Sequence, residues 1–223
     1  MTDQQGVGPT PDNTAAAILA GGLARRMGGV DKGLQLFHGA ALIEHAIHRL
    51  KKQTFGTPGL IGLNANRNQQ QYAQWGLPVW SDLNQDFAGP LAGFQAALGH
   101  CRSNAPHIAY LLMIPCDSPL FPLDLLSRMS DGLMAAGADV AVAVGREDGA
   151  SNTQEVRRQP VFCLMRTSVL ESLTAYLAQG GRKIDTWMDT CKTVDIPFDQ
   201  PTDRVDAFFN ANTLAQLQHP ASP

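Results

Sequence analysis

Short apolar runs alternate along this chain with segments in which apolar residues recur every three or four positions. The runs 15–20, 59–63, 108–114 and 138–144 have the length and boundaries of buried strands, and 108–114 is nearly continuous, as in a central parallel strand covered on both faces. Between the first two runs, apolar residues at helical spacing predict an amphipathic helix over 42–50. The alternation predicts an α/β fold.

The same criteria predict the remaining elements. Further helices are expected at 68–75, 90–101, 123–135 and 168–177 and from 182 through 188, and further strands at 34–37, 78–80, 161–165 and 192–198, the last at a sheet edge. Ser168 and Glu171 fit a capping box, and Asn66 or Asn68 is expected to cap its helix. The polar stretch 145–154 is expected to be a flexible loop, and a final helix to follow residue 213.

Composition favours one domain. The chain has 223 residues, of which 44% are hydrophobic, enough for one well-buried core, and no repeat or composition break divides it. Residues 1–13 and 219–223, rich in Gly, Pro and polar residues, are expected to be disordered tails, which leaves 14–218 as the domain.

Charge and cysteine content exclude several function classes. A net charge of −3 gives no general attraction to nucleic acid or to an anionic membrane, so any binding of anions must be local. The four cysteines are far apart and form no C-x-x-C pair, which favours a reduced cytoplasmic protein without a structural zinc. His45 and His48 lie three residues apart, but a solvated helix face is favoured over a metal site because no third ligand accompanies them.

A glycine-rich segment follows the first strand. Glycines at 21, 22, 28 and 29 allow backbone N–H groups to approach a phosphate closely, and this loop lies where an open α/β sheet binds its ligands. Arg25, Arg26 and Lys32 add positive charges that suit a polyphosphate. Neither the Walker A spacing nor G-x-G-x-x-G is present. The alternative is a glycine-rich surface loop with solvated basic residues.

Polar residues follow three of the expected strands where the chain leaves the sheet. Asn64, Asp82 and Asp117 occupy these positions, and the C-terminal ends of parallel strands share one edge, so they are expected on the same rim as the glycine loop. Asn64 offers donor and acceptor atoms for a base edge, and Asp117 lies where a hard divalent cation would bind near cationic phosphate binders. The alternatives are an Asx turn at Asn64 and plain caps at Asp82 and Asp117.

Two further features complete this rim. Gly89 and Pro90 begin a helix whose N-terminus is expected to point at the rim, and Gly89 with Gly93 permits close packing of that helix on a ligand or neighbouring backbone. Cys116 has no histidine near it in the sequence, and its neighbour Asp117 is expected to raise the pKa of its thiol, so it is interpreted as small filler rather than as a nucleophile.

These motifs carry a family resemblance. The segments Leu19-Ala-Gly-Gly22, Arg25-Arg26-Met27-Gly28-Gly29 and Asp31-Lys32 resemble the signature loop of the molybdenum cofactor guanylyltransferases, a branch of the nucleotidyltransferase superfamily. The double glycine after Ala20 separates them from cytidylyltransferase relatives, which usually carry Ala-Ala-Gly there. The segment 89–93 resembles the family's G-P-L-x-G, and 210–213 resembles N-x-N-T-P-E but departs from it after Thr213.

The resemblance implies a fold and a reaction. The fold would be a single three-layer Rossmann-like nucleotidyltransferase domain with a mostly parallel central sheet. The reaction would be transfer of GMP from GTP to the phosphate of molybdenum-molybdopterin, forming molybdopterin guanine dinucleotide and releasing pyrophosphate. The alternatives are a molybdopterin cytidylyltransferase or sugar-1-phosphate nucleotidyltransferase on the same fold, and a non-catalytic chaperone that binds the nucleotide or the cofactor.

The resemblance also implies roles for individual residues. Catalytic roles fall to Arg26, Lys32 and Asp117, and Asp117 would also hold Mg²⁺. The implied GTP-binding residues are Leu19, Ala20, Gly21, Gly22, Lys32, Asn64, Asp82, Gly89 and Asp117. The implied molybdopterin-binding residues are Arg157, Arg158, Arg182, Lys183, Asn210 and Asn212. The expected protein is a cytoplasmic monomer that binds no nucleic acid and no membrane, with apo-molybdoenzymes or their chaperones as further candidate partners.

Overall fold

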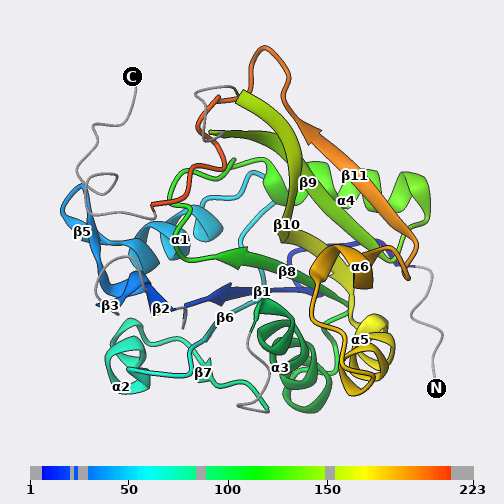
Figure 1. The fold of residues 1–223 in the computed structure, drawn as a ribbon, viewed down its shortest axis with the longest axis horizontal. Coiled ribbons are helices and arrows are strands. Elements are labelled where there is room, and N and C mark those ends of the chain that lie inside the picture. Colours follow the sequence, from blue (N-terminus) through cyan, green and yellow to red (C-terminus); the bar gives the residue numbers. More distant parts are fainter. Residues whose placement is uncertain (1–6, 21–22, 25–29, 84–88, 149–153, 212–223) are drawn as a thin grey trace.

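The computed structural model describes residues 7–20, 23–24, 30–83, 89–148 and 154–211 (Figure 1). Its centre is a seven-stranded sheet with the strand order β11-β9-β10-β8-β1-β6-β7. Strands β1, β6, β7 and β8 run parallel, β11 runs parallel to β9, and β10 runs antiparallel to both of its neighbours. The expectation of an α/β fold with a mostly parallel sheet is therefore confirmed.

The elements follow the alternation in the sequence. The strands are β1 (Thr14–Leu19), β2 (Leu23–Ala24), β3 (Val30–Asp31), β4 (Leu36–Phe37), β5 (Ala40–Ala41), β6 (Leu60–Asn64), β7 (Val79–Trp80), β8 (Tyr110–Pro115), β9 (Val140–Asp148), β10 (Gln154–Arg166) and β11 (Thr193–Phe198). The α-helices are α1 (Leu42–Lys51), α2 (Gln69–Tyr72), α3 (Pro90–Asn104), α4 (Leu125–Ala136), α5 (Leu170–Ala178) and α6 (Ile184–Met188), and the 3-10 turns are η3 (Lys32–Leu34), η4 (Ala73–Trp75) and η5 (Thr167–Val169).

Helices cover both faces of the sheet. On one face, Ala16 and Ile18 of β1 join a core with α1 and α4, and on the other Ala15 and Ala17 join a core with α3, α5 and α6. Successive residues of a strand point to opposite faces, so a strand buried on both sides consists almost entirely of small or apolar residues. This explains the continuous apolar runs of β1 and β8, and it confirms the three-layer arrangement.

The stretch 145–154 was expected to be a flexible loop, but residues 145–148 and 154 belong to strands, and residues 149–153 lie outside the described residues. Strand β9 continues to Asp148 and β10 begins at Gln154, and the two strands pair from Gln154↔Asp148 through Gln159↔Ala143. Backbone hydrogen bonds between antiparallel strands form whatever the polarity of the side chains, so a polar segment can be a strand. The hairpin projects at the top of the view in Figure 1.

Two capping expectations are wrong. Ser168 lies inside η5, and α5 begins after Val169 without a side-chain cap, so Ser168 and Glu171 form no capping box. Asn68 occupies the cap position of α2 in the left-handed conformation, with φ of 49°, but its side chain makes no capping hydrogen bond. The side chain of Asn66 instead bonds to Asp82. At Asn66, a hydrogen bond to the distant Asp82 replaces the local cap. At Ser168, a short 3-10 turn takes the place of the capped helix start.

The chain ends are described in part. Residues 7–13 lie against the N-terminal end of the sheet, where the Tyr110 hydroxyl donates to the Val7 carbonyl oxygen over 2.8 Å and the Asn13 carbonyl accepts from Ala109 and Tyr110. This part of the expected N-terminal tail therefore belongs to the ordered chain. The expected final helix after residue 213 and the tail 219–223 lie outside the described residues. None of the helices that the structure describes is long and apolar enough to cross a membrane.

Candidate functional site

The candidate site lies where β1, β6, β7 and β8 end. Strand β1 has β6 on one side and β8 on the other, so the chain turns in opposite directions from this point, which is where open α/β sheets bind ligands. Backbone hydrogen bonds continue just past the strands: the Ala20 N–H donates to the Asn64 carbonyl oxygen over 2.9 Å and the Cys116 N–H donates to the Leu19 carbonyl oxygen over 3.1 Å. Ala20, Asn64 and the segment at Asp117 are thus brought to one edge.

An ion pair joins two of the residues expected to be catalytic. The Lys32 Nζ lies 2.7 Å from Asp117 Oδ2, with the lysine and aspartate side chains only 19% and 18% exposed. Lys32 begins η3, directly after β3, and Asp117 follows β8, so the two charges meet from positions 85 residues apart. A partly buried, charge-assisted contact of this length fixes both side chains relative to each other.

A second polar network holds the Asp82 carboxylate. The Asn64 Nδ2 donates to Asp82 Oδ1 over 3.0 Å, and the Asn66 Nδ2 donates to Asp82 Oδ2 over 2.7 Å. The Asp82 backbone N–H returns a bond to Asn66 Oδ1 over 2.8 Å. The residues after β6 and β7 therefore orient one carboxylate, and each of its oxygens has a second lone pair for a further donor.

The start of α3 packs tightly on this network. A Cβ added at Gly93 would lie 2.5 Å from Leu19 Cδ2 and 2.6 Å from Asn64 Oδ1, so only glycine allows this approach. Gly89 occupies the position before the helix with φ of 143°, and Pro90 is the first helical residue. The close packing expected of Gly93 is confirmed, whereas an added Cβ at Gly89 would meet nothing within 4 Å.

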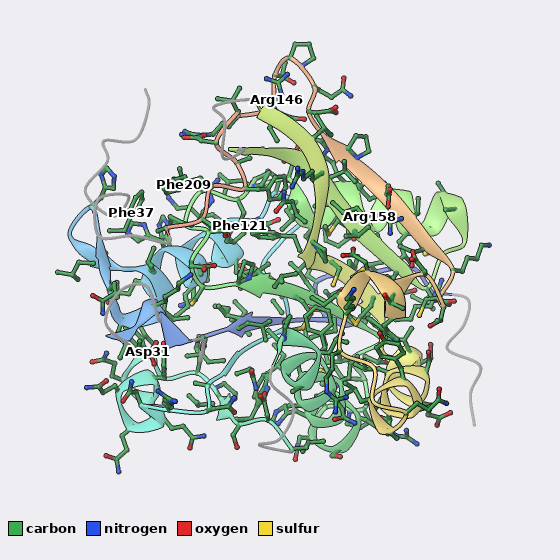
Figure 2. The ribbon with its side chains drawn as sticks, in the orientation of Figure 1. Asp31, Phe37, Phe121, Arg146, Arg158 and Phe209 are labelled. Carbon is green, nitrogen blue, oxygen red and sulfur yellow. The ribbon has the colours of Figure 1, made fainter. Side chains whose placement is uncertain are left out.

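The residues expected to bind molybdopterin fall into two places. Asn210 lies beside the Lys32–Asp117 pair, because its Oδ1 accepts from the Ser118 hydroxyl over 2.6 Å and the next N–H, of Ala211, donates to the Asp117 carbonyl oxygen over 2.8 Å. Arg158 instead bonds to Asp195 over 2.8 Å and to Asp189 over 3.4 Å, and Figure 2 shows it well away from Asp31.

The remaining basic residues lie on the side of Arg158 or on the hairpin. Arg182 donates to the Leu177 and Gly181 carbonyl oxygens over 3.2 and 2.6 Å, and Lys183 occupies the position before α6, so both belong to the turn between α5 and α6. Arg157 pairs with Gly145 in the β9–β10 hairpin. The structure therefore brings only Asn210 of the described set to the Lys32–Asp117 pair. Arg26, Gly21, Gly22 and Asn212 lie outside the described residues.

Other candidate groups are accounted for. Among the residues that the structure describes, no group of three or more His, Cys, Asp or Glu side chains could hold a metal ion. His45, at the partly buried edge of α1, contacts the Phe37 carbonyl oxygen through its Nε2 over 2.6 Å. Cys116 is fully buried, and burial together with the nearby Asp117 raises the pKa of its thiol well above the ordinary value, which confirms it as an inert core residue.

Several residues of the site had no functional role in the sequence interpretation. Asn66 was expected to cap a helix and instead orients Asp82, and Ser118 reaches Asn210 from the residue after Asp117. Asp31 accepts hydrogen bonds from Tyr72 and Asn68. For Asp31, Tyr72 and Asn68, the only sequence signal was the position of Asp31 directly before Lys32. Their hydrogen bonds connect segments 37 and 41 residues apart, so no local pattern predicts them.

Known proteins with similar sequences identify the family of this chain. Residues 16–192 match the family described as MobA-like NTP transferase domain. The chain is 50% identical over 201 residues to the molybdenum cofactor guanylyltransferase of Acidovorax sp. (strain JS42), covering 90% of this chain and 91% of that protein. It is 49% identical over 209 residues to the protein of the same name from Albidiferax ferrireducens, with 94% and 95% covered.

Solved structures share the fold. The molybdopterin-guanine dinucleotide biosynthesis protein A from Archaeoglobus fulgidus matches with a TM-score of 0.65 at 21% identity, covering 91% of this chain and 94% of that one. A CMP:2-keto-3-deoxy-manno-octonic acid synthetase complexed with CTP matches with a TM-score of 0.63 at 11% identity, covering 84% and 90%. The family match over most of the domain and the identity to curated relatives along nearly the whole chain lead to one assignment: the chain belongs to the MobA-like NTP transferase family and, within it, to the molybdenum cofactor guanylyltransferases.

Proposed function

We propose that this site performs the reaction for which its relatives are named. GMP is transferred from GTP to the phosphate of molybdenum-molybdopterin, which forms molybdopterin guanine dinucleotide and releases pyrophosphate. The observation that carries the proposal is the ion pair between Lys32, which follows β3, and Asp117, which follows β8. A cation for phosphate and an anion for a divalent metal lie there side by side, at the ligand-binding edge of the sheet.

In this reaction, the side chains mainly position the substrates and neutralise their charge. The substrate phosphate is the nucleophile that attacks the α-phosphorus, and pyrophosphate leaves, so no side-chain general base is required. We assign Lys32 to neutralise negative charge on the transferred group, and Arg26 to the same task on the triphosphate. The Lys32 side chain is largely buried, which strengthens its interaction with a phosphate relative to an exposed lysine.

The residues present fit magnesium. Mg²⁺ binds proteins through one or two carboxylates and completes its octahedron with substrate phosphates and water. Asp117 supplies a hard oxygen ligand at a fixed place, and its side chain is 18% exposed, so a metal ion arriving with GTP can reach it. We propose that Asp117 holds Mg²⁺, which when bound would neutralise phosphate charge. Lys32 would then exchange its contact with Asp117 for one with a phosphate.

We assign nucleobase recognition to Asp82. Guanine presents two adjacent donors, N1–H and the N2 amino group, and a carboxylate can accept from both. Asn64 and Asn66 hold the two Asp82 oxygens in place, so the acceptors are oriented before the nucleotide arrives. Cytosine lacks this pair of adjacent donors, which is why the network favours a guanylyltransferase over a cytidylyltransferase.

The experiment is a nucleotide panel with molybdenum-molybdopterin, scored by release of pyrophosphate. Turnover with GTP and little with CTP, ATP or UTP is expected. Preference for CTP would overturn the guanylyltransferase proposal and support the cytidylyltransferase alternative. Binding of GTP without any pyrophosphate release would support the non-catalytic chaperone.

The substitution Asp82→Asn tests the recognition of guanine directly. The amide places a donor where guanine also donates, so one charge-assisted hydrogen bond is lost, and KM for GTP is expected to rise about ten- to a hundredfold. The KM for molybdopterin should stay within about threefold, since Asp82 is not assigned to that substrate. Asp131→Asn, on the exposed face of α4, is the matched control. An unchanged selectivity for GTP in Asp82→Asn would remove Asp82 from base recognition.

We place the molybdopterin phosphate and ring near Asn210. The side chain is held by Ser118, whose neighbour Asp117 belongs to the reaction centre, so a substrate contacting Asn210 lies within reach of the transferred group. Asn210→Ala is expected to raise KM for molybdopterin about tenfold and to leave KM for GTP within about threefold. Asn104→Ala, at the exposed C-terminal end of α3, is the control. The reverse pattern would mean that Asn210 serves GTP.

Four other residues remain proposed molybdopterin ligands: Arg157, Arg158, Arg182 and Lys183. Arg158 would have to leave Asp189 and Asp195 to reach a phosphate beside Asn210. Its two ion pairs make it a weaker assignment than Asn210. Measuring KM for molybdopterin in Arg158→Ala beside Asn210→Ala ranks the two.

We also propose that the enzyme acts as a monomer in the cytoplasm, with apo-molybdoenzymes or their chaperones as further partners. The thiols of Cys101, Cys116 and Cys163 are free and buried, in keeping with a reducing compartment. Among the described residues, the exposed large hydrophobic side chains come from different segments of the sequence, in keeping with a monomer: Val7, Leu36, Leu83, Met134, Val156 and Val205. Gel filtration with light scattering tests the oligomeric state.

A further inference from the structure

Tyr72 places a buried hydroxyl group between Ala20 and Asp31. It is the last residue of α2 and is fully buried. Its hydroxyl donates to the Asp31 carboxylate and lies 3.2 Å from the Ala20 carbonyl oxygen. Two acceptors from different parts of the chain thus converge on one hydroxyl.

These two acceptors flank the glycine loop. Ala20 comes directly before Gly21, and Asp31 comes directly before Lys32. Between them, β2 and β3 pair in antiparallel register, with Leu23↔Asp31 and Ala24↔Val30. The hydroxyl of Tyr72 therefore ties the start of the loop to its end, at the point from which Lys32 reaches Asp117.

The Asp31 carboxylate has two further donors. The Gly33 N–H donates to its Oδ1 over 3.2 Å, which begins the turn η3 that carries Lys32. The Asn68 Nδ2 donates to its Oδ2 over 3.0 Å from a left-handed backbone position. Asp31 consequently connects the turn that carries Lys32 to the segment that continues from Asn64 and Asn66. Those two asparagines donate hydrogen bonds to Asp82.

The local structure is built around the hydroxyl. A Cβ added at Gly33 would lie 2.4 Å from the Tyr72 Oη, so the absence of a side chain there is what lets Tyr72 approach (Figure 2 shows Asp31 beside α2). Burial raises the pKa of Tyr72 far above its ordinary value, with a further rise from the nearby Cys116 and Asp31, so the hydroxyl stays protonated and remains a donor.

We propose that Tyr72 is a positioning residue for GMP transfer, which acts through Asp31 to hold Lys32 opposite Asp117. The inference rests on the proposed function, because it gives Tyr72 a role only in relation to Lys32. Tyr72 itself is buried and contacts protein groups rather than a substrate. Its effect is to fix the lysine before GTP binds, and misplacing a catalytic charge by an ångström is costly.

The test is Tyr72→Phe, which keeps the ring and removes the hydroxyl. With GTP and molybdenum-molybdopterin, kcat/KM for GTP is expected to fall about ten- to thirtyfold, since one hydrogen bond to a charged group is lost. KM for molybdopterin is expected to stay within about threefold. Wild-type kcat/KM for GTP in a folded Tyr72→Phe protein would overturn the inference.

Tyr110→Phe is the matched control. Tyr110 is equally buried and its hydroxyl also makes hydrogen bonds, to Val7 and Arg166, but it begins β8 at the opposite end from the site. Both variants should lower the melting temperature, because both lose buried hydrogen bonds. Only Tyr72→Phe should lose turnover. Equal loss of turnover in the two variants would reduce Tyr72 to a structural residue and overturn the inference.

A double-substitution cycle tests the route through Lys32. If Tyr72 acts by positioning that amine, Tyr72→Phe in a Lys32→Met background should change the remaining rate less than about twofold, although it costs tenfold or more in the wild type. Fully additive effects would contradict the proposed route. If Tyr72→Phe fails to fold, Asn68→Gly removes another Asp31 partner, keeps the left-handed backbone and should lower kcat/KM about threefold. An unchanged value there would overturn the inference.

Pyrophosphate release by the wild-type protein distinguishes a failure of this inference from a failure of the proposed function. Wild-type protein that releases no pyrophosphate with GTP and molybdenum-molybdopterin would remove the proposed function and this inference with it. Wild-type protein that turns over while Tyr72→Phe turns over equally well would remove the inference alone.

Discussion

Asp117→Asn is expected to lower the rate of GMP transfer about 10²- to 10³-fold, the usual loss when a preorganised electrostatic group is removed from a reaction centre. Asparagine has the same size, and the Asp117 backbone carbonyl that accepts from Ala211 is unaffected, so the fold should be retained. GTP should still bind, because the glycine loop and Asp82 are intact. Single-turnover rates beside calorimetric titration with GTP separate the two effects.

The magnesium dependence sharpens this test. In the wild type the rate should saturate with Mg²⁺, whereas Asp117→Asn should need a higher Mg²⁺ concentration or fail to saturate, because its neutral amide is a weaker ligand. Asp131→Asn on the exposed face of α4 also removes one carboxylate and should behave as the wild type. Near wild-type turnover of Asp117→Asn at ordinary magnesium concentration would show that Asp117 does not hold the metal.

The strands themselves, and the site residues at their ends, were predictable from the sequence. A strand buried on both faces must be apolar throughout, which identified β1 and β8. The C-terminal ends of parallel strands meet at one edge, so the polar residues at or just past the ends of β6, β7 and β8 had to lie together. Asn64, Asp82 and Asp117 were predicted in this way to share one edge of the sheet.

Contacts across the chain were not predictable. The hydrogen bonds of Tyr72 to Asp31 and of Asn66 to Asp82 join residues 41 and 16 positions apart, and nothing in the local pattern of either segment specifies the partner. The local alternatives, a core tyrosine and a helix cap, are the commoner roles of these residue types. The amide of Asn66 was therefore assigned to capping, and the hydroxyl of Tyr72 received no role.

The position of Arg158 shows a second limit. A strand places successive side chains on opposite faces, so Arg157 and Arg158 cannot both face the substrate, but the sequence does not say which one does. That choice depends on the register of β10 against β9, which shifts between Gln159 and Cys163. In the structure, Arg158 forms an ion pair with Asp195 of the edge strand β11. Nothing in the sequence pattern indicated this pairing.

Gly93→Ala is expected to weaken GTP binding about ten- to a hundredfold, although Gly93 lies on a helix and need not touch the nucleotide. Its new Cβ would lie 2.6 Å from Asn64 Oδ1 and 2.5 Å from Leu19 Cδ2, closer than carbon atoms can approach. Asn64 must shift, which breaks its hydrogen bond to Asp82 Oδ1 and disorders the guanine acceptor. Overpacking should also lower the free energy of unfolding by about 1–3 kcal/mol.

Gly99→Ala on the same helix separates this contact from the properties of glycine. An added Cβ at Gly99 meets nothing within 4 Å, so alanine there should raise stability by up to about 1 kcal/mol through its better helix propensity. GTP affinity should stay within about threefold of the wild type. The two substitutions are thus expected to change stability with opposite signs, and only Gly93→Ala should weaken GTP. If both weakened GTP equally, the rigidity of α3 as a whole, rather than the contact of Gly93 with Asn64, would set the affinity. If Gly93→Ala bound GTP as the wild type does, Asn64 would have no part in orienting Asp82 for guanine.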